Sequence, residues 1–292
     1  MGGIRIVTDS ACDLSDALAE AHGITIVPLF IRFGDEELTD RQDLGPTEFW
    51  ARCLASPELP TTAAPATGSF QAAYLDAADQ GYDGVVCCTI SSGLSATYES
   101  ALGAAAAVAE RIAVRVVDTR SVTLGQGLIT LAAAERATAG GDLDAVVDAA
   151  ERRIPLTRVY GVLATLDHLQ RGGRIGGARA LLGSLLSIKP VIQVRDGVVA
   201  EESKQRTRSR SLEYLVAKAT ADAPFERVAI ASGAAADVGV VVDGLADVDT
   251  QHAVLVSELG PVVGTHAGPG TIGVAYVLPG ADDAGRSGPT AD

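Results

Sequence analysis

The first half of the chain alternates short apolar runs with helical patterns, and this alternation constrains the fold more than any other feature. Strands are indicated by the runs 4–7, 24–29, 85–90 and 114–117, and helices by the patterns at 17–21, 96–109, 127–139 and 142–152. Strands that alternate with helices are typical of an α/β domain with a largely parallel sheet. The sequence therefore predicts an α/β domain over residues 1–155.

The pattern changes after Pro155. Strands are indicated at 159–163 and 228–230, helices at 166–170, 178–186, 209–219 and 237–245, and further strands near the C-terminus. Residues 191–199 turn on Asp196-Gly197 between two apolar runs, which favours a β-hairpin. We expect a second, α+β domain with antiparallel strands over 156–279. Residues 280–292 are mostly Gly, Ala, Asp, Ser and Pro, and they predict a disordered tail.

Charge and composition restrict the possible partners. The formal net charge of −14 argues against binding to nucleic acid or to an anionic membrane surface. Residues 151–210 are an exception, because they hold 12 Lys and Arg against 5 Asp and Glu. Such a basic segment can receive a phosphate or a carboxylate. With no leader pattern and no apolar run of about 20 residues, we expect a cytoplasmic protein without a transmembrane segment.

Several kinds of cofactor chemistry find no pattern in this chain. The four histidines are widely scattered and the four cysteines lack ligand spacing, so no metal site is expected. Cys87 and Cys88 lie in an apolar run and are interpreted as small core residues. There is no Walker loop, which argues against ATP chemistry within the chain. The literal G-x-G-x-x-G at 268–273 is followed by a strand pattern, which argues against dinucleotide binding.

Ser95 lies in a segment that comes close to a catalytic motif. The stretch Gly93-Leu94-Ser95-Ala96-Thr97 is one residue short of the G-x-S-x-G elbow of serine hydrolases. The elbow needs glycine on both sides, because its strained turn leaves no room for side chains. Thr97 replaces the second glycine. A serine hydrolase (esterase) that uses Ser95, with His266 as its base, is therefore kept as the alternative hypothesis.

Polar groups gather where ligands bind in open parallel sheets, beyond the carboxyl ends of the strands. Three predicted strand ends carry such groups, at 8–10, 91–93 and 118–121. Each alone is interpreted as a helix cap, and together they favour a crevice. The segment 61–67 is restricted to extended backbone before Pro65, and it can offer hydroxyl and N–H groups to a ligand carboxylate.

The loop at 171–177, with the sequence RGGRIGG, is a more specific oxyanion candidate. Glycines allow backbone N–H groups to converge, and the loop's arginines can bind a phosphate or carboxylate in bidentate fashion. A solvated loop is the alternative interpretation. The cations at 204–210 are near enough in sequence for one or two to join such a site. Of the four histidines, His266 between Gly264 and Gly268 is the strongest functional candidate, against a purely structural role.

Taken together, these motifs resemble the DegV family, whose fatty-acid-binding members serve as the FakB-type subunit of bacterial fatty acid kinase. The resemblance runs from about Ile4 to Leu278, and the motifs occur in the family's order. They are Thr8-Asp9-Ser10, Thr62 with Pro65, 91–98, Asp118, 166–175, Ile188-Lys189-Pro190, Arg206 and 266–270.

The resemblance implies the fold, ligand and site residues. It implies a two-domain DegV-like fold with a long-chain fatty acid in an apolar tunnel of the second domain. Thr62 and Ser95 match the family's carboxylate-binding residues, and Arg174, Arg206 and His266 match its head-group and phosphate residues. A separate ATP-binding kinase subunit would phosphorylate the bound carboxylate, and the carrier would deliver acyl-phosphate to phospholipid synthesis. No catalytic residue, metal or cofactor is implied, and transient membrane contact is allowed.

Three segments depart from the usual family pattern. Residues 62–65 read Thr-Ala-Ala-Pro instead of T-S-Q-P, and 95–97 read Ser-Ala-Thr instead of S-G-T. Asp118 is followed by Thr119 instead of serine. The first two can narrow the acyl preference or shift the head group. A third hypothesis, a binding module for another small carboxylate, would be favoured by a cavity too short for a long chain.

Overall fold

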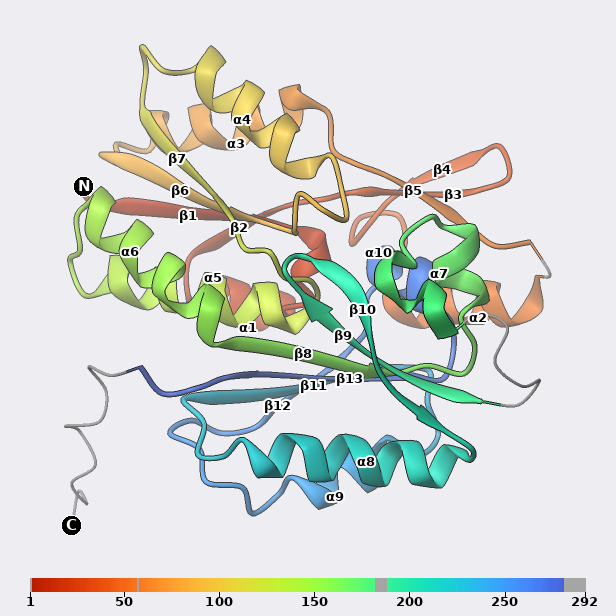
Figure 1. Cartoon of the computed structure of the whole chain (residues 1–292). Helices are drawn as coiled ribbons and strands as arrows, with labels where there is room; N and C mark the ends of the chain where they lie inside the picture. Colours follow the sequence, from red (N-terminus) through yellow and green to blue (C-terminus); the bar gives the residue numbers. More distant parts are fainter. Residues whose placement is uncertain (1, 57, 182–187, 281–292) are drawn as a thin grey trace.

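The computed structural model describes residues 2–56, 58–181 and 188–280. Its elements stack in alternating layers, with helices α3 and α4 outermost at one end and α8 and α9 at the other (Figure 1). The tail expected at 280–292 lies outside the described residues, apart from Gly280. None of the described helices is both long and apolar enough to cross a membrane.

The first sheet has four parallel strands in the order β2-β1-β6-β7. They span Ile24–Val27, Ile4–Asp9, Gly84–Thr89 and Ala113–Asp118. Every residue of β6 is buried, because helices cover both faces of the sheet. Val85 and Cys87 pack on one face and Val86 and Cys88 on the other, which confirms both cysteines as core residues.

The helices of this half divide between the two faces of the parallel sheet. Helices α3 (Thr67–Asp79) and α4 (Thr97–Ala107) cover one face. Helices α1 (Asp16–Ala21), α5 (Leu124–Thr138) and α6 (Leu143–Arg153) lie on the other. All residues from Leu124 to Ala134 are buried, since α5 is also covered by the second sheet. The predicted parallel α/β arrangement is confirmed.

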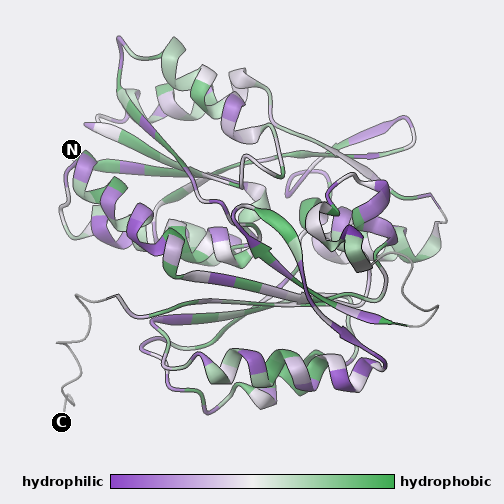
Figure 2. Cartoon of the chain, in the orientation of Figure 1, coloured by the Kyte–Doolittle hydropathy of each residue, from purple (hydrophilic) through white to green (hydrophobic). Residues whose placement is uncertain are grey.

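The second sheet has six strands in the order β10-β9-β8-β13-β11-β12. They span Val198–Gln205, Lys189–Arg195, Thr157–Val162, Thr271–Val277, Arg227–Gly233 and Leu255–Glu258. All neighbours are antiparallel except β11 and β12, and the expected β9–β10 hairpin is present. Helices α8 (Arg208–Ala221) and α9 (Val238–Gly244) cover the outer face. Figure 2 shows hydrophobic residues along much of the two large sheets, whereas the β3–β4 hairpin is mostly hydrophilic and α6 and α8 carry both hydrophobic and hydrophilic residues.

A third, three-stranded antiparallel sheet was missed by the sequence analysis, which assigned no element between Leu29 and Thr61. Its strands, in spatial order, are β4 (Glu36–Thr39), β3 (Phe30–Phe33) and β5 (Thr61–Ala63). Helix α2 (Pro46–Ala55) lies between β4 and β5 in the chain. Strands of three or four residues are too short to show a clear alternation. The extended backbone predicted for the segment before Pro65 is confirmed in β5.

Two further expectations need correction. A helix is expected at 178–186, but the structure has a 3-10 helix, η3 (Gly176–Leu181), which includes the last two residues of the predicted loop. Residues 182–187 lie outside the described residues. His266 lies on a helix that was not expected, α10 (Pro261–Ala267). Pro261 starts α10 because its fixed φ and missing N–H suit the first helical position. The remaining short elements are η1 (Ser10–Cys12), η2 (Ile154–Leu156) and α7 (Asp167–Arg171).

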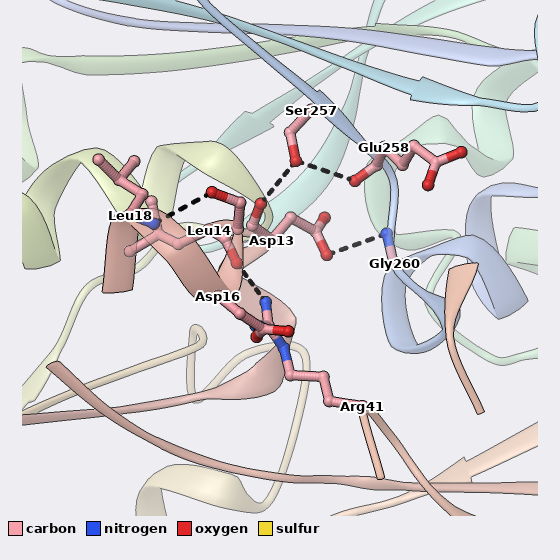
Figure 3. A network of polar contacts seen from close by, with 9 residues as sticks. Asp13, Leu14, Asp16, Leu18, Arg41, Ser257, Glu258 and Gly260 are labelled. Atoms are coloured by element: carbon pink, nitrogen blue, oxygen red, sulfur yellow. Dashed lines mark hydrogen bonds and ion pairs between the residues drawn. The ribbon is translucent and has the colours of Figure 1, made fainter. Parts of the chain in front are cut away.

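Asp13 joins the two halves of the molecule (Figure 3). One carboxylate oxygen accepts from the Thr123 hydroxyl at 2.5 Å, before α5, and the other accepts from the Gly260 N–H at 3.0 Å, before α10. The Asp13 carbonyl accepts from the hydroxyl of Ser257 in β12 at 3.0 Å. Burial raises the pKa of the Asp13 carboxyl to about 7. This side chain therefore fixes where α10 begins relative to the parallel sheet.

The stability contributed by Asp13 should depend on pH. Its folded pKa is raised above the value of 3.8 for the unfolded chain, so the contribution is lost as pH rises through about 7. Asp13→Asn stays neutral and keeps an acceptor for the Gly260 N–H. We expect this variant to gain stability relative to the wild type by about 1 kcal/mol or more between pH 5 and 8. Urea denaturation at each pH measures the difference, and a difference independent of pH would contradict the account.

Candidate functional site

An apolar cavity lies between the two large sheets, with about 860 Å³ of space free of protein atoms, its open mouth included. The second sheet supplies its floor from β8, β9, β10 and β13. The remaining walls come from β5, α7 and α10 and from the loops after β2, β6, α7 and β12 and before α5. The apolar side chains are Leu29, Ile90, Leu94, Val122, Val159, Leu163, Leu169, Ile192, Val194, Val199, Leu259, Val262, Val263 and Ala267. A concave site with a mainly apolar lining and a few polar groups is typical of small-molecule binding.

Four of the five predicted site residues line this cavity, although they come from distant parts of the chain. Thr62 lies on β5, Ser95 precedes α4, Arg174 follows α7 and His266 lies on α10. The Thr62 hydroxyl and His266 Nε2 are 2.9 Å apart and hydrogen bonded. The fold thus brings together two residues that are 204 positions apart.

His266 is held as a neutral imidazole. Burial, together with the nearby Arg174 and His168, lowers the pKa of His266 to about 4. Gly172 packs so closely on the ring that a Cβ there would lie 2.3 Å from Nδ1. Within the described residues Nδ1 is buried without a hydrogen-bond partner. A neutral ring beside a hydroxyl can share hydrogen bonds with a bound anion without adding a charge of its own.

Protein contacts fix the position of Arg174 and Ser95. Arg174 donates to the Leu94 carbonyl at 3.1 Å and to the Gly172 carbonyl at 2.6 Å. The Ser95 hydroxyl is 2.8 Å from the Thr97 hydroxyl and accepts weakly from the Thr97 N–H at 3.3 Å. Ala96, where the family pattern has glycine, has φ −73° and is unstrained. The loop therefore tolerates the added methyl group without a change of backbone conformation.

A second, polar cleft meets the apolar cavity at Thr62, Arg174 and His266. Its free space is about 1190 Å³, open solvent included. Its charged and titratable lining comprises Arg32, Glu58, His168, Arg171, Arg174 and His266. A group held at the junction has apolar walls on one side and mainly cationic walls on the other.

Three residues of this cleft are not predicted from the sequence. Arg171 belongs to the RGGRIGG motif, but it was not named as a site residue. His168 was ranked below His266, and its Nδ1 is 3.1 Å from the Thr265 carbonyl, where it supports α10. Arg32 lies on β3, an element that was not expected. Of these three residues, only Arg171 could have been found from the sequence, because it lies in the RGGRIGG motif close to Arg174.

Arg206 lies apart from the other four predicted residues. It is exposed in the turn between β10 and α8, and it is not among the described residues that line either cavity. Its assignment to the head group stays a prediction.

The polar residues at the three strand ends mostly bind the protein itself. Asp9 accepts from the backbone N–H groups of Ala11 and Ile90 at 3.0 and 2.7 Å, and Thr8 donates to the Cys88 carbonyl. Ser91 donates to the carbonyl of Gly197, at the tip of the β9–β10 hairpin, at 2.6 Å. These groups shape turns and hold the hairpin, whereas the expected crevice is lined by their apolar neighbours.

The hydrolase alternative finds no support in this geometry. Thr97, which replaces the second glycine of the elbow, is fully buried and begins α4. His266 is hydrogen bonded to Thr62, and the Ser95 hydroxyl to Thr97.

Within the described residues, no group of three or more His, Cys, Asp or Glu is arranged to hold a metal ion.

Comparison with known proteins identifies the family. Residues 3–278 match a family model described as an uncharacterised protein of the DegV family. The chain belongs to the DegV family. A DegV domain-containing protein of Streptomyces coelicolor is 40% identical over 282 residues, which cover 93% of this chain and 97% of that one.

Solved structures of DegV proteins share the fold. A DegV family protein from Thermus thermophilus, described by its fatty acid binding, has a TM-score of 0.85 and 34% identity, covering 94% of this chain and all of that one. DegV from Bacillus subtilis, described as a fatty acid binding protein, has a TM-score of 0.83 and 31% identity, covering 95% and 99%. The two-sheet α/β architecture is therefore that of the DegV family.

The contact between the hairpin and the parallel sheet can be tested at Gly93. A Cβ there would lie 2.8 Å from the Gly197 carbonyl oxygen and 2.9 Å from Val198 Cγ1. We expect Gly93→Ala to push the hairpin away and to lower the free energy of unfolding by about 1–3 kcal/mol. Gly68→Ala is the control, because a Cβ at this exposed position in α3 meets no atom within 4 Å. Equal stability of the two variants in urea denaturation would refute the close contact.

Proposed function

We propose that this chain binds a long-chain fatty acid in the apolar cavity, with the carboxylate at Thr62, Ser95, Arg174 and His266. The observation that carries the proposal is an apolar cavity with one polar end that opens onto a cationic cleft. The fatty-acid-binding descriptions of the Thermus thermophilus and Bacillus subtilis relatives support it. The extent of the apolar lining favours a long chain over a small carboxylate.

The chemistry of the two ends suits an amphipathic acid. Each buried CH₂ contributes roughly 0.8 kcal/mol, so an acyl chain provides most of the affinity. The hydroxyl groups of Thr62 and Ser95 can donate to the carboxylate, and Arg174 supplies a nearby positive charge. His266 stays neutral above about pH 4, so the carboxylate is not locked into a buried ion pair with an imidazolium.

We further propose that the bound carboxylate is phosphorylated by a separate ATP-dependent kinase subunit, with the chain then carrying acyl-phosphate toward phospholipid synthesis. The carboxylate end faces a cleft lined by Arg32, Arg171 and His168, where cations can stabilise negative charge that develops on a transferred phosphoryl group. Arg206, which is exposed, is proposed as a further phosphate contact that the partner would bring into use. The lipid-binding unit would be residues 156–279, and residues 1–155 would supply Thr62 and Ser95.

The carboxylate contacts are tested by comparing an acid with the alcohol of the same chain length. We expect the wild type to bind the acid more tightly than the alcohol. Thr62→Val should lower the affinity for the acid by about tenfold or more and leave the affinity for the alcohol nearly unchanged. Displacement of a fluorescent fatty acid measures both affinities. Thr138→Val is the control, because that hydroxyl donates to the Ala134 carbonyl at the far end of α5.

Two outcomes would overturn the proposal. If neither ligand displaces the probe from the wild type, the cavity is not a fatty acid site. If Thr62→Val lowers the affinities for acid and alcohol equally, the carboxylate does not lie at Thr62.

A further inference from the structure

Helix α2 presents an apolar patch to solvent. Phe49 and Trp50 are buried on its inner side, whereas Ala51, Leu54 and Ala55 are exposed. Ala51 precedes Leu54 by three residues and Ala55 by four, so all three lie on one face of the helix. Leu54 is 68% exposed, more than any other large hydrophobic side chain in the described part of the chain. A partner that covers this face would remove apolar area from water.

Acidic side chains predominate around this patch. Glu48 of α2 and Glu36 of β4 both pair with Arg52 at 2.8 Å, so two carboxylates share one guanidinium group. Arg52 also lies over the ring of Phe33, which holds the β3–β4 hairpin beside α2. The charged residues of α2, of the hairpin and of the position just after α2 are Asp35, Glu36, Glu37, Glu48 and Glu58 against Arg32 and Arg52. The patch and these charges together are called the α2 surface below.

The α2 surface borders the polar cleft. Residues 58–60, which follow α2, line the cleft and lead into β5 with Thr62. On its inner side α2 packs on α10, where a Cβ at Gly264 would lie 2.7 Å from Phe49 Cε1 and 2.8 Å from Trp50 Cη2. Figure 1 shows α2 beside α10, on the same side of the molecule as the β3–β4 hairpin. A protein bound to the α2 surface therefore reaches the cleft.

Charge determines which partner fits this surface. The cleft is lined by Arg171, Arg174 and His168, which suit a phosphate, whereas the α2 surface next to it is acidic. A protein that transfers a phosphoryl group from ATP holds the polyphosphate with basic side chains and Mg²⁺. Its phosphates can face the cleft while basic groups around them face the acids of the α2 surface. An anionic membrane or a second copy of this chain would bring like charges together there.

We propose that the α2 surface docks a phosphoryl-transferring protein that has an apolar pocket for Leu54 and Lys or Arg side chains around that pocket. This inference rests on the proposed function, and it adds the surface and the chemistry by which the partner is recognised. Leu54 contributes buried apolar area, and the acids speed the encounter and set its orientation. Leu54 is not among the residues that line the apolar cavity, so docking and fatty acid binding can be measured separately.

The test measures phosphoryl transfer to bound oleic acid. The loaded chain is mixed with the ATP-dependent kinase subunit of the same organism and radiolabelled ATP. We expect Leu54→Asp to raise KM for the loaded chain about tenfold and to leave kcat within about twofold. The affinity of this variant for oleic acid, from displacement of a fluorescent fatty acid, stays at the wild-type value. Val240→Asp is the control, because Val240 is 52% exposed on α9, on the outer face of the second sheet.

A charge reversal gives an independent measurement. Glu48→Lys keeps Leu54 in place and changes one acid of the α2 surface into a base. We expect it to raise KM several-fold at low ionic strength, and the difference from the wild type to shrink as salt is added, because exposed charges are screened. Asp79→Lys, at an exposed acid in α3, should leave KM nearly unchanged at each salt concentration.

The possible failures are distinguishable. Wild-type KM values for both Leu54→Asp and Glu48→Lys overturn the docking surface and leave the proposed function intact. A loss of kcat without a change in KM, or a loss of affinity for oleic acid, also overturns it. If Leu54→Asp dissociates a wild-type dimer in light scattering and keeps its KM, a second copy covers α2 and the inference is wrong.

Failure of the proposed function gives a different pattern. A wild type that binds oleic acid but receives no label overturns phosphorylation by the kinase subunit, and this inference with it, while fatty acid binding stands. A wild type that binds no fatty acid overturns the proposed function as a whole.

Discussion

The structure depends on helix α5, which packs against both large sheets in one hydrophobic core and leaves the apolar cavity beside its first residues unfilled. Specific polar contacts also join the two halves of the molecule: Asp13 accepts from the Gly260 N–H, Ser91 donates to the Gly197 carbonyl, and Trp50 donates to the Leu259 carbonyl at 3.1 Å. Atoms that line an unfilled apolar cavity lack dispersion contacts on one side. A ligand that fills the cavity supplies these contacts and stabilises the folded state.

The same arrangement explains why polarity appears at only one end of the cavity. Helix α10 and strand β5 cross the open end, and they carry the hydrogen-bonded pair His266 and Thr62. Arg174 reaches the junction from the loop after α7. An amphipathic ligand therefore has a single favourable orientation, with its polar group beside the cationic cleft. The orientation of such a ligand is set by the elements that close the cavity. It does not require a buried ion pair.

Much of the fold could be predicted from local pattern. The all-buried run of β6 and the Asp-Gly turn of the hairpin carry strong local signals, and both elements form where expected. The missed elements β3 and β4 are only four residues long, and their stability comes from pairing across the chain. Helix α10 begins at a proline after a glycine, in a stretch that was interpreted only as a glycine-rich motif around His266.

The site was less accessible to sequence reasoning. No local pattern indicates that Thr62 and His266 meet, because their contact depends on how β5 and α10 pack in three dimensions. The family resemblance named both residues, whereas composition indicated only that 151–210 is basic.

Native mass spectrometry of the freshly purified full-length chain tests the central claim most directly. The account predicts a dominant species carrying one additional mass that matches a long-chain fatty acid, which is released on denaturation. Protein that is purified without any bound lipid, and that acquires none when long-chain fatty acids are added, would contradict it.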